Sequence, residues 1–118
     1  MHCCGGVAYT TENSILPPMI NHLVLWKMKP LADGRTGLEN AAILAQRINA
    51  LKSVIQDCLA IEAGLDFNKS PAAYDVALYS RFKNKEELEA YQKHPAHVAV
   101  AEWVSTVVET RAVVDFEI

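Results

Sequence analysis

The chain has 118 residues, of which 51% are apolar, and this suits one domain with a single core. Its 11 Lys and Arg and 14 Asp and Glu give a net charge of -3, and the lack of any basic stretch argues against nucleic acid as a partner. No apolar run approaches the roughly 18 residues of a membrane span, and the 3 cysteines, an odd number, make no disulfide framework. We therefore expect a cytoplasmic protein with neither a nucleic-acid nor a membrane partner.

The first 18 residues combine Gly, Thr, Asn and a Pro pair with little periodicity. We interpret 1–18 as an N-terminal extension (a tag, a disordered stretch or an upstream segment) to a domain covering 19–118. Metal or redox chemistry at His2, Cys3 and Cys4 is the alternative. Adjacent cysteines without a second pair of ligands are weak evidence for it, so we expect no metal site there.

The first predicted strand covers 20–29, where residues alternate between two faces and both faces are largely apolar. One face carries His22, Val24, Trp26 and Met28. Such a strand is expected to be covered on both sides. Pro30 and Asp33-Gly34 then predict a turn.

Thr36 and Glu39 have the spacing of a capping box, which predicts a helix beginning there. Apolar residues then recur at intervals of three and four, and this stripe is expected to pack on a sheet. Its members are Leu38, Ala41, Leu44, Ala45, Ile48 and Leu51.

Two further strands are predicted from alternation over 59–67 and 74–82, paired as a hairpin across the turn residues 68–71. In the first of them Leu59, Ile61, Ala63, Leu65 and Phe67 share one face. Asn84, with Glu87 three residues later, predicts the start of a short helix. Leu88 and Tyr91 form the buried edge of this helix.

Pro95 divides the stretch from Tyr91 to His97, because proline is excluded from a helix interior but favoured in a first turn. We predict one helix ending near Lys93 and another starting at Pro95. His97 then lies in the first turn, where the positive end of the helix disfavours the imidazolium form. A neutral imidazole is what a general base needs. An apolar helix follows, and alternation over 111–118 predicts a fourth strand.

The resulting order β-α-β-β-α-α-β predicts a ferredoxin-like α+β fold with an antiparallel four-stranded sheet. Helices on one side leave the other face bare, and its apolar residues do not tolerate water. We therefore expect a homodimer in which two sheets pack face to face, forming a dimeric α/β barrel.

The chain from Ile20 to Ile118 resembles the stress-responsive A/B barrel (Dabb) family. The stretches that carry the resemblance are Ile20–Lys27, Ser70–Tyr79 and Tyr91–Val98, the last with the pattern Y-x-x-H-P-x-H. The family implies a dimeric ferredoxin-like fold more firmly than an activity.

The Y-x-x-H-P-x-H pattern is similar to that of plant polyketide cyclases of the olivetolic acid cyclase type. There a tyrosine and a histidine carry an aldol condensation without a cofactor. The resemblance implies Tyr91 and His97 as their counterparts, and His22 as the first-strand histidine. Val76 stands where the cyclase has a third histidine, which argues against the cyclase substrate.

The candidate catalytic pair is His97, as a proton acceptor, and Tyr91, as a hydrogen-bond donor to a developing enolate. Apolar walls would exclude water from their pocket. The candidate pocket residues are His22, Val24, Trp26, Phe82, His94 and Trp103. Each of these has an equally ordinary structural interpretation, since histidines and aromatic residues often fill cores. His94 and His97 alone are too few for a catalytic metal, so neither a metal nor a cofactor is expected.

Three functions remain open at this point. The favoured one is a dimeric protein with a pocket for an apolar, carbonyl-bearing small molecule. The second is a cofactor-independent enzyme, cyclase-like or monooxygenase-like, that uses His97 and Tyr91. The third is a purely structural protein that only self-associates.

Overall fold

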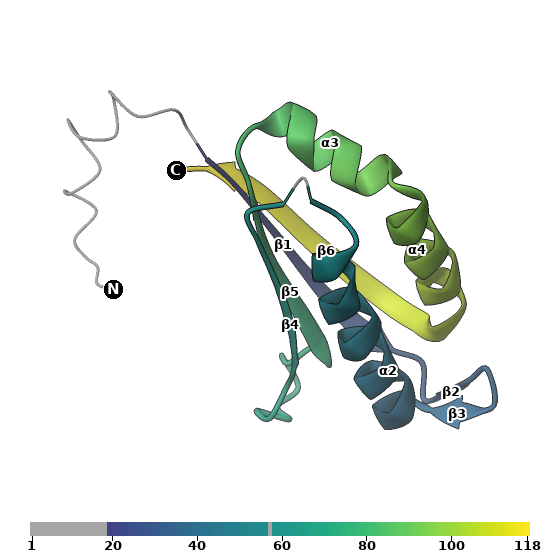
Figure 1. Ribbon diagram of the computed structural model, residues 1–118. Coiled ribbons are helices and arrows are strands. Elements are labelled where there is room, and N and C mark those ends of the chain that lie inside the picture. Colours follow the sequence, from purple (N-terminus) through teal and green to yellow (C-terminus); the bar gives the residue numbers. More distant parts are fainter. Residues whose placement is uncertain (1–18, 57) are drawn as a thin grey trace.

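The computed structural model describes residues 19–56 and 58–118. In this part of the chain a four-stranded antiparallel sheet, ordered β4-β5-β1-β6, packs against helices α2, α3 and α4 (Figure 1). The element bounds are β1 Ile20–Met28, β2 Leu31–Ala32, β3 Arg35–Thr36, α2 Gly37–Ala50, the 3-10 helix η2 Leu51–Ser53, β4 Ala60–Leu65, β5 Val76–Phe82, α3 Lys85–Lys93, α4 Pro95–Val107 and β6 Val108–Glu117. The predicted ferredoxin-like α+β fold is confirmed. The predictions made for His2, Cys3, Cys4 and the rest of 1–18 lie outside the described residues.

The β2–β3 ribbon was predicted only as a turn. It is a hairpin closed by Asp33 and Gly34, whose φ angles are +53° and +72°. A two-residue connection with both central residues in the left-handed region is the turn that matches strand twist, and Asp-Gly is a preferred sequence for it. The ribbon leads directly into α2.

Helix α2 begins as the capping box predicts. The Thr36 hydroxyl accepts from the Glu39 amide at 3.2 Å, and the Glu39 carboxylate accepts from the Thr36 amide at 2.9 Å. The predicted stripe faces the sheet, with one correction: Leu38 is 68% exposed. It belongs to the first turn, which extends beyond the sheet, so helical spacing alone did not decide its burial.

The strands β4 and β5 pair antiparallel, as predicted, but both are shorter than predicted. Only Ile61 and Ala63 of the predicted apolar row on β4 are buried, and Phe67 is 95% exposed. The strand ends because Asp66 turns the chain, accepting from the Asn68 and Lys69 amides at 3.0 and 2.8 Å. At the other end of the sheet, β6 starts directly after α4, three residues earlier than the alternation indicated.

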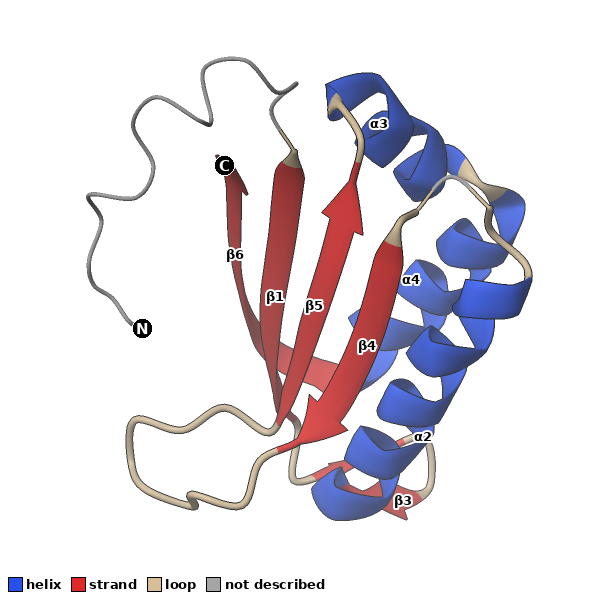
Figure 2. Ribbon diagram, turned by 60° about the vertical axis from the view of Figure 1, so that its left-hand side comes forward, coloured by secondary structure: helices blue, strands red, loops and turns tan. Residues whose placement is uncertain are grey.

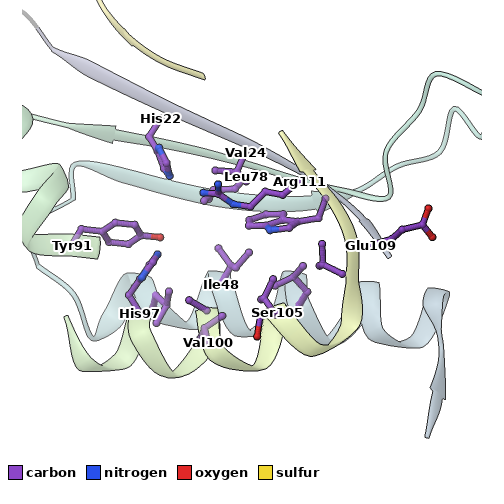
Figure 3. A pocket seen from close by; sticks show the side chains of 16 residues that line it. His22, Val24, Ile48, Leu78, Tyr91, His97, Val100, Ser105, Glu109 and Arg111 are labelled. Atoms are coloured by element: carbon purple, nitrogen blue, oxygen red, sulfur yellow. The ribbon is translucent and has the colours of Figure 1, made fainter. Parts of the chain in front are cut away.

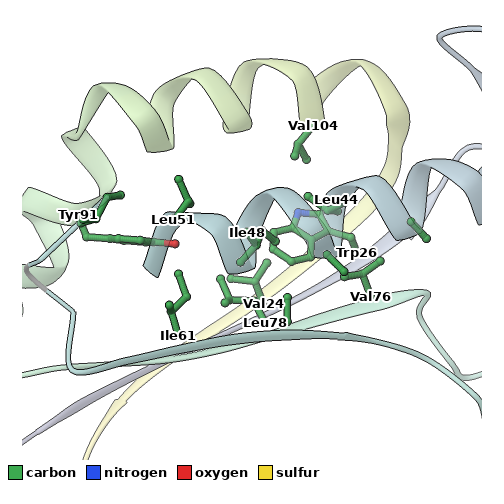
Figure 4. Packing of buried hydrophobic residues seen from close by; sticks show 14 of the residues in the cluster. Val24, Trp26, Leu44, Ile48, Leu51, Ile61, Val76, Leu78, Tyr91 and Val104 are labelled. Carbon is green, nitrogen blue, oxygen red and sulfur yellow. The ribbon is translucent and has the colours of Figure 1, made fainter. Parts of the chain in front are cut away.

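The helices of the described chain lie on one face of the sheet (Figure 2). Between them and the sheet lies the core, in which Trp26 and Val24 of β1 meet Leu44 and Ile48 of α2 (Figure 4). None of the helices formed by the described residues is long and apolar enough to cross a bilayer.

The opposite face of the sheet carries apolar side chains that no helix formed by residues 19–56 and 58–118 covers. Leu25, Tyr79, Val114 and Phe116 are exposed there, and strand register places them on neighbouring strands of one face. This arrangement is the bare face that the sequence predicted.

Candidate functional site

A cavity of about 390 Å³ opens between the helix-facing side of the sheet and helices α2 and α4 (Figure 3). Most of its walls are apolar. Its lining residues are His22, Val24, Trp26, Leu44, Ile48, Leu51, Leu78, Tyr91, His97, Val100, Ala101, Val104, Ser105, Val108, Glu109 and Arg111. Helix α4 supplies one wall because its residues recur at intervals of three and four from His97 onward.

The break between α3 and α4 brings Tyr91 and His97 together. The Nδ1 atom of His94 accepts from the Ala96 amide at 3.0 Å and caps α4, while Pro95 occupies its first turn. Tyr91, in the last turn of α3, and His97, in the first turn of α4, then have ring centroids 4.6 Å apart and planes at 63°. The helix break predicted from Pro95 is confirmed.

Tyr91 is a core residue with its polar end at the cavity. The side chain is 1% exposed, and its ring packs on Phe82 with centroids 5.0 Å apart. No hydrogen bond to its hydroxyl occurs among residues 19–56 and 58–118, and Figure 3 shows the oxygen directed into the cavity. Burial, with a smaller effect from Cys58, raises the pKa of Tyr91. The hydroxyl therefore stays protonated and available as a donor.

His97 is half-buried on the other side of the Tyr91 ring. Its Nδ1 atom is buried and has no hydrogen-bond partner among the described residues. Burial is the largest cause that lowers the pKa of His97, and the charges of His22, Arg111 and His94 lower it further. The backbone of Gln92 acts in the opposite direction. The pKa of His97 is therefore shifted in the direction predicted from the helix end, but the main cause of the shift is desolvation.

His22 is fixed by an acid on the neighbouring strand. It pairs with Asp115 across the β1–β6 ladder, and its Nδ1 atom hydrogen-bonds the Asp115 carboxylate. The Ser80 hydroxyl donates to the His22 carbonyl at 3.1 Å. Asp115 was missed as a site residue because the alternation on β6 gave its face but not the strand that it would pair with. A prediction that β1 and β6 are neighbouring strands would have placed Asp115 opposite His22.

Three of the predicted pocket residues lie outside the cavity lining. Phe82 is buried behind Tyr91, and His94 caps α4. Trp103 faces the β2–β3 ribbon, where its Nε1 donates to Asp33 at 3.1 Å. Its ring also contacts Arg47 of α2, whose Cζ atom lies 4.3 Å from the ring centroid. Helical spacing placed Trp103 on the apolar side of α4, but the α4 residues that line the cavity include Val100 and Val104 and not Trp103.

The cavity lining also includes polar residues that sequence reasoning missed, namely Ser105, Glu109 and Arg111. Within residues 19–56 and 58–118, no three His, Cys, Asp or Glu side chains gather closely enough to hold a metal ion. His97 and Tyr91 can take part in proton transfer and hydrogen bonding at this cavity.

Residues 20–118 match the model of the stress responsive A/B barrel domain. The chain belongs to this family. The Dabb resemblance drawn from the first strand and the Tyr91–His97 stretch is thereby confirmed.

The chain is also similar to a bacterial protein in sequence and to solved proteins in fold. An uncharacterized protein of Streptomyces coelicolor is 38% identical over 88 residues, covering 72% of this chain and 87% of that protein. A dimeric protein of unknown function with a ferredoxin-like fold, from Bacteroides fragilis, has a TM-score of 0.70 and 33% identity, covering 85% of this chain and 96% of its own. A hydroxynitrile lyase from Passiflora edulis has a TM-score of 0.72 over 87% of this chain and 95% of its own, but 16% identity, so the likeness is one of fold alone.

Proposed function

We propose that this Dabb domain binds a small apolar molecule bearing a carbonyl group in the cavity between its sheet and α4. The observation that carries the proposal is the meeting of Tyr91 and His97, 4.6 Å apart between ring centroids, at a cavity of about 390 Å³. Small-molecule sites are typically apolar hollows of a few hundred cubic ångströms with a few convergent polar groups. This combination favours ligand binding over a purely structural role.

The two polar groups suit a carbonyl compound. The Tyr91 hydroxyl lacks a partner among the described residues and can donate to a carbonyl oxygen. The neutral His97 ring can accept a hydrogen bond, or a proton, from the carbon beside that carbonyl. Apolar walls from Val24, Ile48 and Val104 would enclose the remainder of the molecule.

Filling the cavity tests the proposal directly. We expect 2-octanone to bind the full chain in a calorimetric titration and Val100→Trp, which places an indole in the cavity wall, to abolish this binding. Val98→Trp is the matched control, since Val98 is an exposed residue of the same helix that does not line the cavity. Circular dichroism checks that each variant is folded, and Ala101→Phe serves as a second blocking variant. Equal binding by the blocked and control variants, or none by the wild type, would refute the proposal.

Catalysis is the second candidate, and the lowered pKa of His97 beside a protonated Tyr91 favours it. In a cofactor-independent enzyme, cyclase-like or monooxygenase-like, the C–H bond beside the carbonyl breaks and its proton moves to His97. The electron pair forms an enolate whose oxygen accepts from Tyr91. The hydroxynitrile lyase of the same fold supports only the point that this architecture can carry an active site.

Deuterium exchange separates catalysis from binding. With 2-octanone in D₂O, we expect the wild type to accelerate exchange at the carbons beside the carbonyl, followed by NMR. General-base catalysis contributes about 10² or more, so His97→Gln should lose most of the acceleration while binding within about threefold of the wild type. Exchange that persists in the variant would eliminate His97 as the base.

We also propose that two copies of the domain pack through the bare sheet face. The apolar residues Leu25, Tyr79, Val114 and Phe116 are exposed there, and a contiguous apolar patch of this kind marks an interaction surface. The related Bacteroides fragilis protein is described as dimeric, which supports the same assembly here. A face that packs on itself about a two-fold axis is the commonest way to cover such a surface.

A further inference from the structure

Arg111 projects over the cavity from the edge of the sheet. It stands directly opposite Trp26 in the β1–β6 ladder, so both side chains leave the sheet on the side that lines the cavity. Figure 3 shows the Arg111 side chain extending across the cavity toward His22. The positive charge of Arg111 helps to lower the pKa of His97. Arg111 therefore lies near the reactive end of the cavity.

Among residues 19–56 and 58–118, the Arg111 guanidinium makes no ion pair. No carboxylate of the described chain lies within ion-pair distance of Arg111. Asp115, on the same strand face, is engaged by His22, and Figure 3 shows the Glu109 carboxylate directed away from the cavity. Guanidinium groups donate hydrogen bonds and accept none, so Arg111, which is exposed to solvent, is free to bind an acceptor that carries negative charge.

Trp26, opposite Arg111 in the ladder, has a donor that finds no partner in the described part of the chain. The Trp26 side chain is 6% exposed, and its Nε1 atom has no hydrogen-bond partner among the described residues. Figure 4 shows this nitrogen on the helix-facing side of the ring. A buried donor that lacks an acceptor costs stability, and indole nitrogen can only donate. Arg111 and Trp26 are thus both hydrogen-bond donors that acceptor oxygen atoms of a ligand would pair with.

We propose that the cavity selects anionic ligands, namely apolar carboxylic acids, with Arg111 binding the carboxylate and Trp26 Nε1 supplying a further donor. This inference rests on the proposed function and narrows its ligand class. A neutral ketone satisfies Tyr91 but leaves Arg111 and Trp26 unpaired. An apolar keto acid satisfies all three, with its carbonyl at Tyr91 and its carboxylate at Arg111.

A matched pair of eight-carbon probes tests the selection. We expect octanoate to bind the full chain about tenfold or more tightly than 1-octanol in calorimetric titrations, as charge-assisted hydrogen bonds are the stronger class. In Arg111→Gln the ratio of the octanoate affinity to the 1-octanol affinity should fall to about one. Arg35→Gln is the control, because Arg35 makes an exposed ion pair with Asp33 at 2.9 Å in the β2–β3 ribbon, and it should keep the full preference.

The indole N–H resonances provide a second readout. The chain has 2 tryptophans. On adding octanoate we expect the Trp26 indole peak to shift, whereas that of Trp103, which already donates to Asp33, should stay in place. Equal binding of octanoate and 1-octanol, or a preference that survives Arg111→Gln, would overturn the anion proposal while leaving the carbonyl pocket intact. If neither probe nor 2-octanone binds, the proposed function itself falls, and the anion proposal with it.

Discussion

Replacing Tyr91 by phenylalanine separates the two roles of this residue. The ring is fully buried between Phe82 and His97, with centroid distances of 5.0 and 4.6 Å. The hydroxyl, in contrast, contacts the cavity and has no hydrogen-bond partner in the described part of the chain. Tyr91→Phe keeps the ring and removes only the hydroxyl, whereas Tyr91→Ala removes both.

The expected magnitudes follow from that division. Tyr91→Ala empties a large core site and should lower the free energy of unfolding by about 3–5 kcal/mol. Tyr91→Phe breaks no hydrogen bond within the described chain, so we expect a change within about 0.5 kcal/mol. Binding of 2-octanone should nevertheless weaken by about 2- to 12-fold, the worth of one hydrogen bond to the carbonyl.

Urea denaturation followed by circular dichroism gives the stabilities, and calorimetry gives the affinities. A loss of more than about 2 kcal/mol in Tyr91→Phe would mean that the hydroxyl has a structural partner, contrary to the geometry. Unchanged affinity for 2-octanone in a folded Tyr91→Phe variant would remove Tyr91 from the proposed site.

The remaining predictions concern His97, the bare face and the start of α2. Burial lowers the pKa of His97 in the folded protein. The contribution of the neutral His97 ring to the free energy of unfolding is therefore complete above the pKa of about 6.5 that a histidine has in the unfolded chain, and it is lost as pH falls through the pKa in the folded protein. His97→Gln should flatten that part of a urea-denaturation pH profile, and an unchanged slope would contradict this. Leu25→Asp should convert the proposed dimer to monomer or aggregate in analytical ultracentrifugation, and a soluble variant dimer of undiminished strength would exclude the proposed interface. A Cβ at Gly37 would lie 2.8 Å from a backbone carbonyl oxygen, whereas one at Gly64 would meet nothing within 4 Å, so Gly37→Ala should cost about 1–3 kcal/mol more than Gly64→Ala by urea denaturation. Equal costs would show that the α2 start relaxes freely.

Features that depend on residues close together in the chain were predictable. The capping box at Thr36 and Glu39 and the cap at Asn84 join residues three apart, so their hydrogen bonds are implied by spacing alone. Proline chemistry at Pro95 likewise fixed the helix break, and with it the approach of Tyr91 to His97.

Burial at the ends of elements was less predictable. Leu38 and Phe67 both continue the correct apolar period, yet both are exposed. A period specifies which face a residue occupies, but not whether another element reaches far enough to cover it. Trp103 shows the same limit on α4, where helical spacing did not decide which side chains would line the cavity.

The sequence by itself determined the α+β class, the order of elements, the helix break and the apolar faces, because local hydrogen bonding and periodicity act over a few residues. Only the tertiary structure decided that His22 meets Asp115 and Trp26 meets Arg111, since these pairs depend on which distant strands become neighbours and in which register. The tertiary structure also decided the cavity, because it forms where side chains from β1, α2, α4 and β6 leave space between them unfilled.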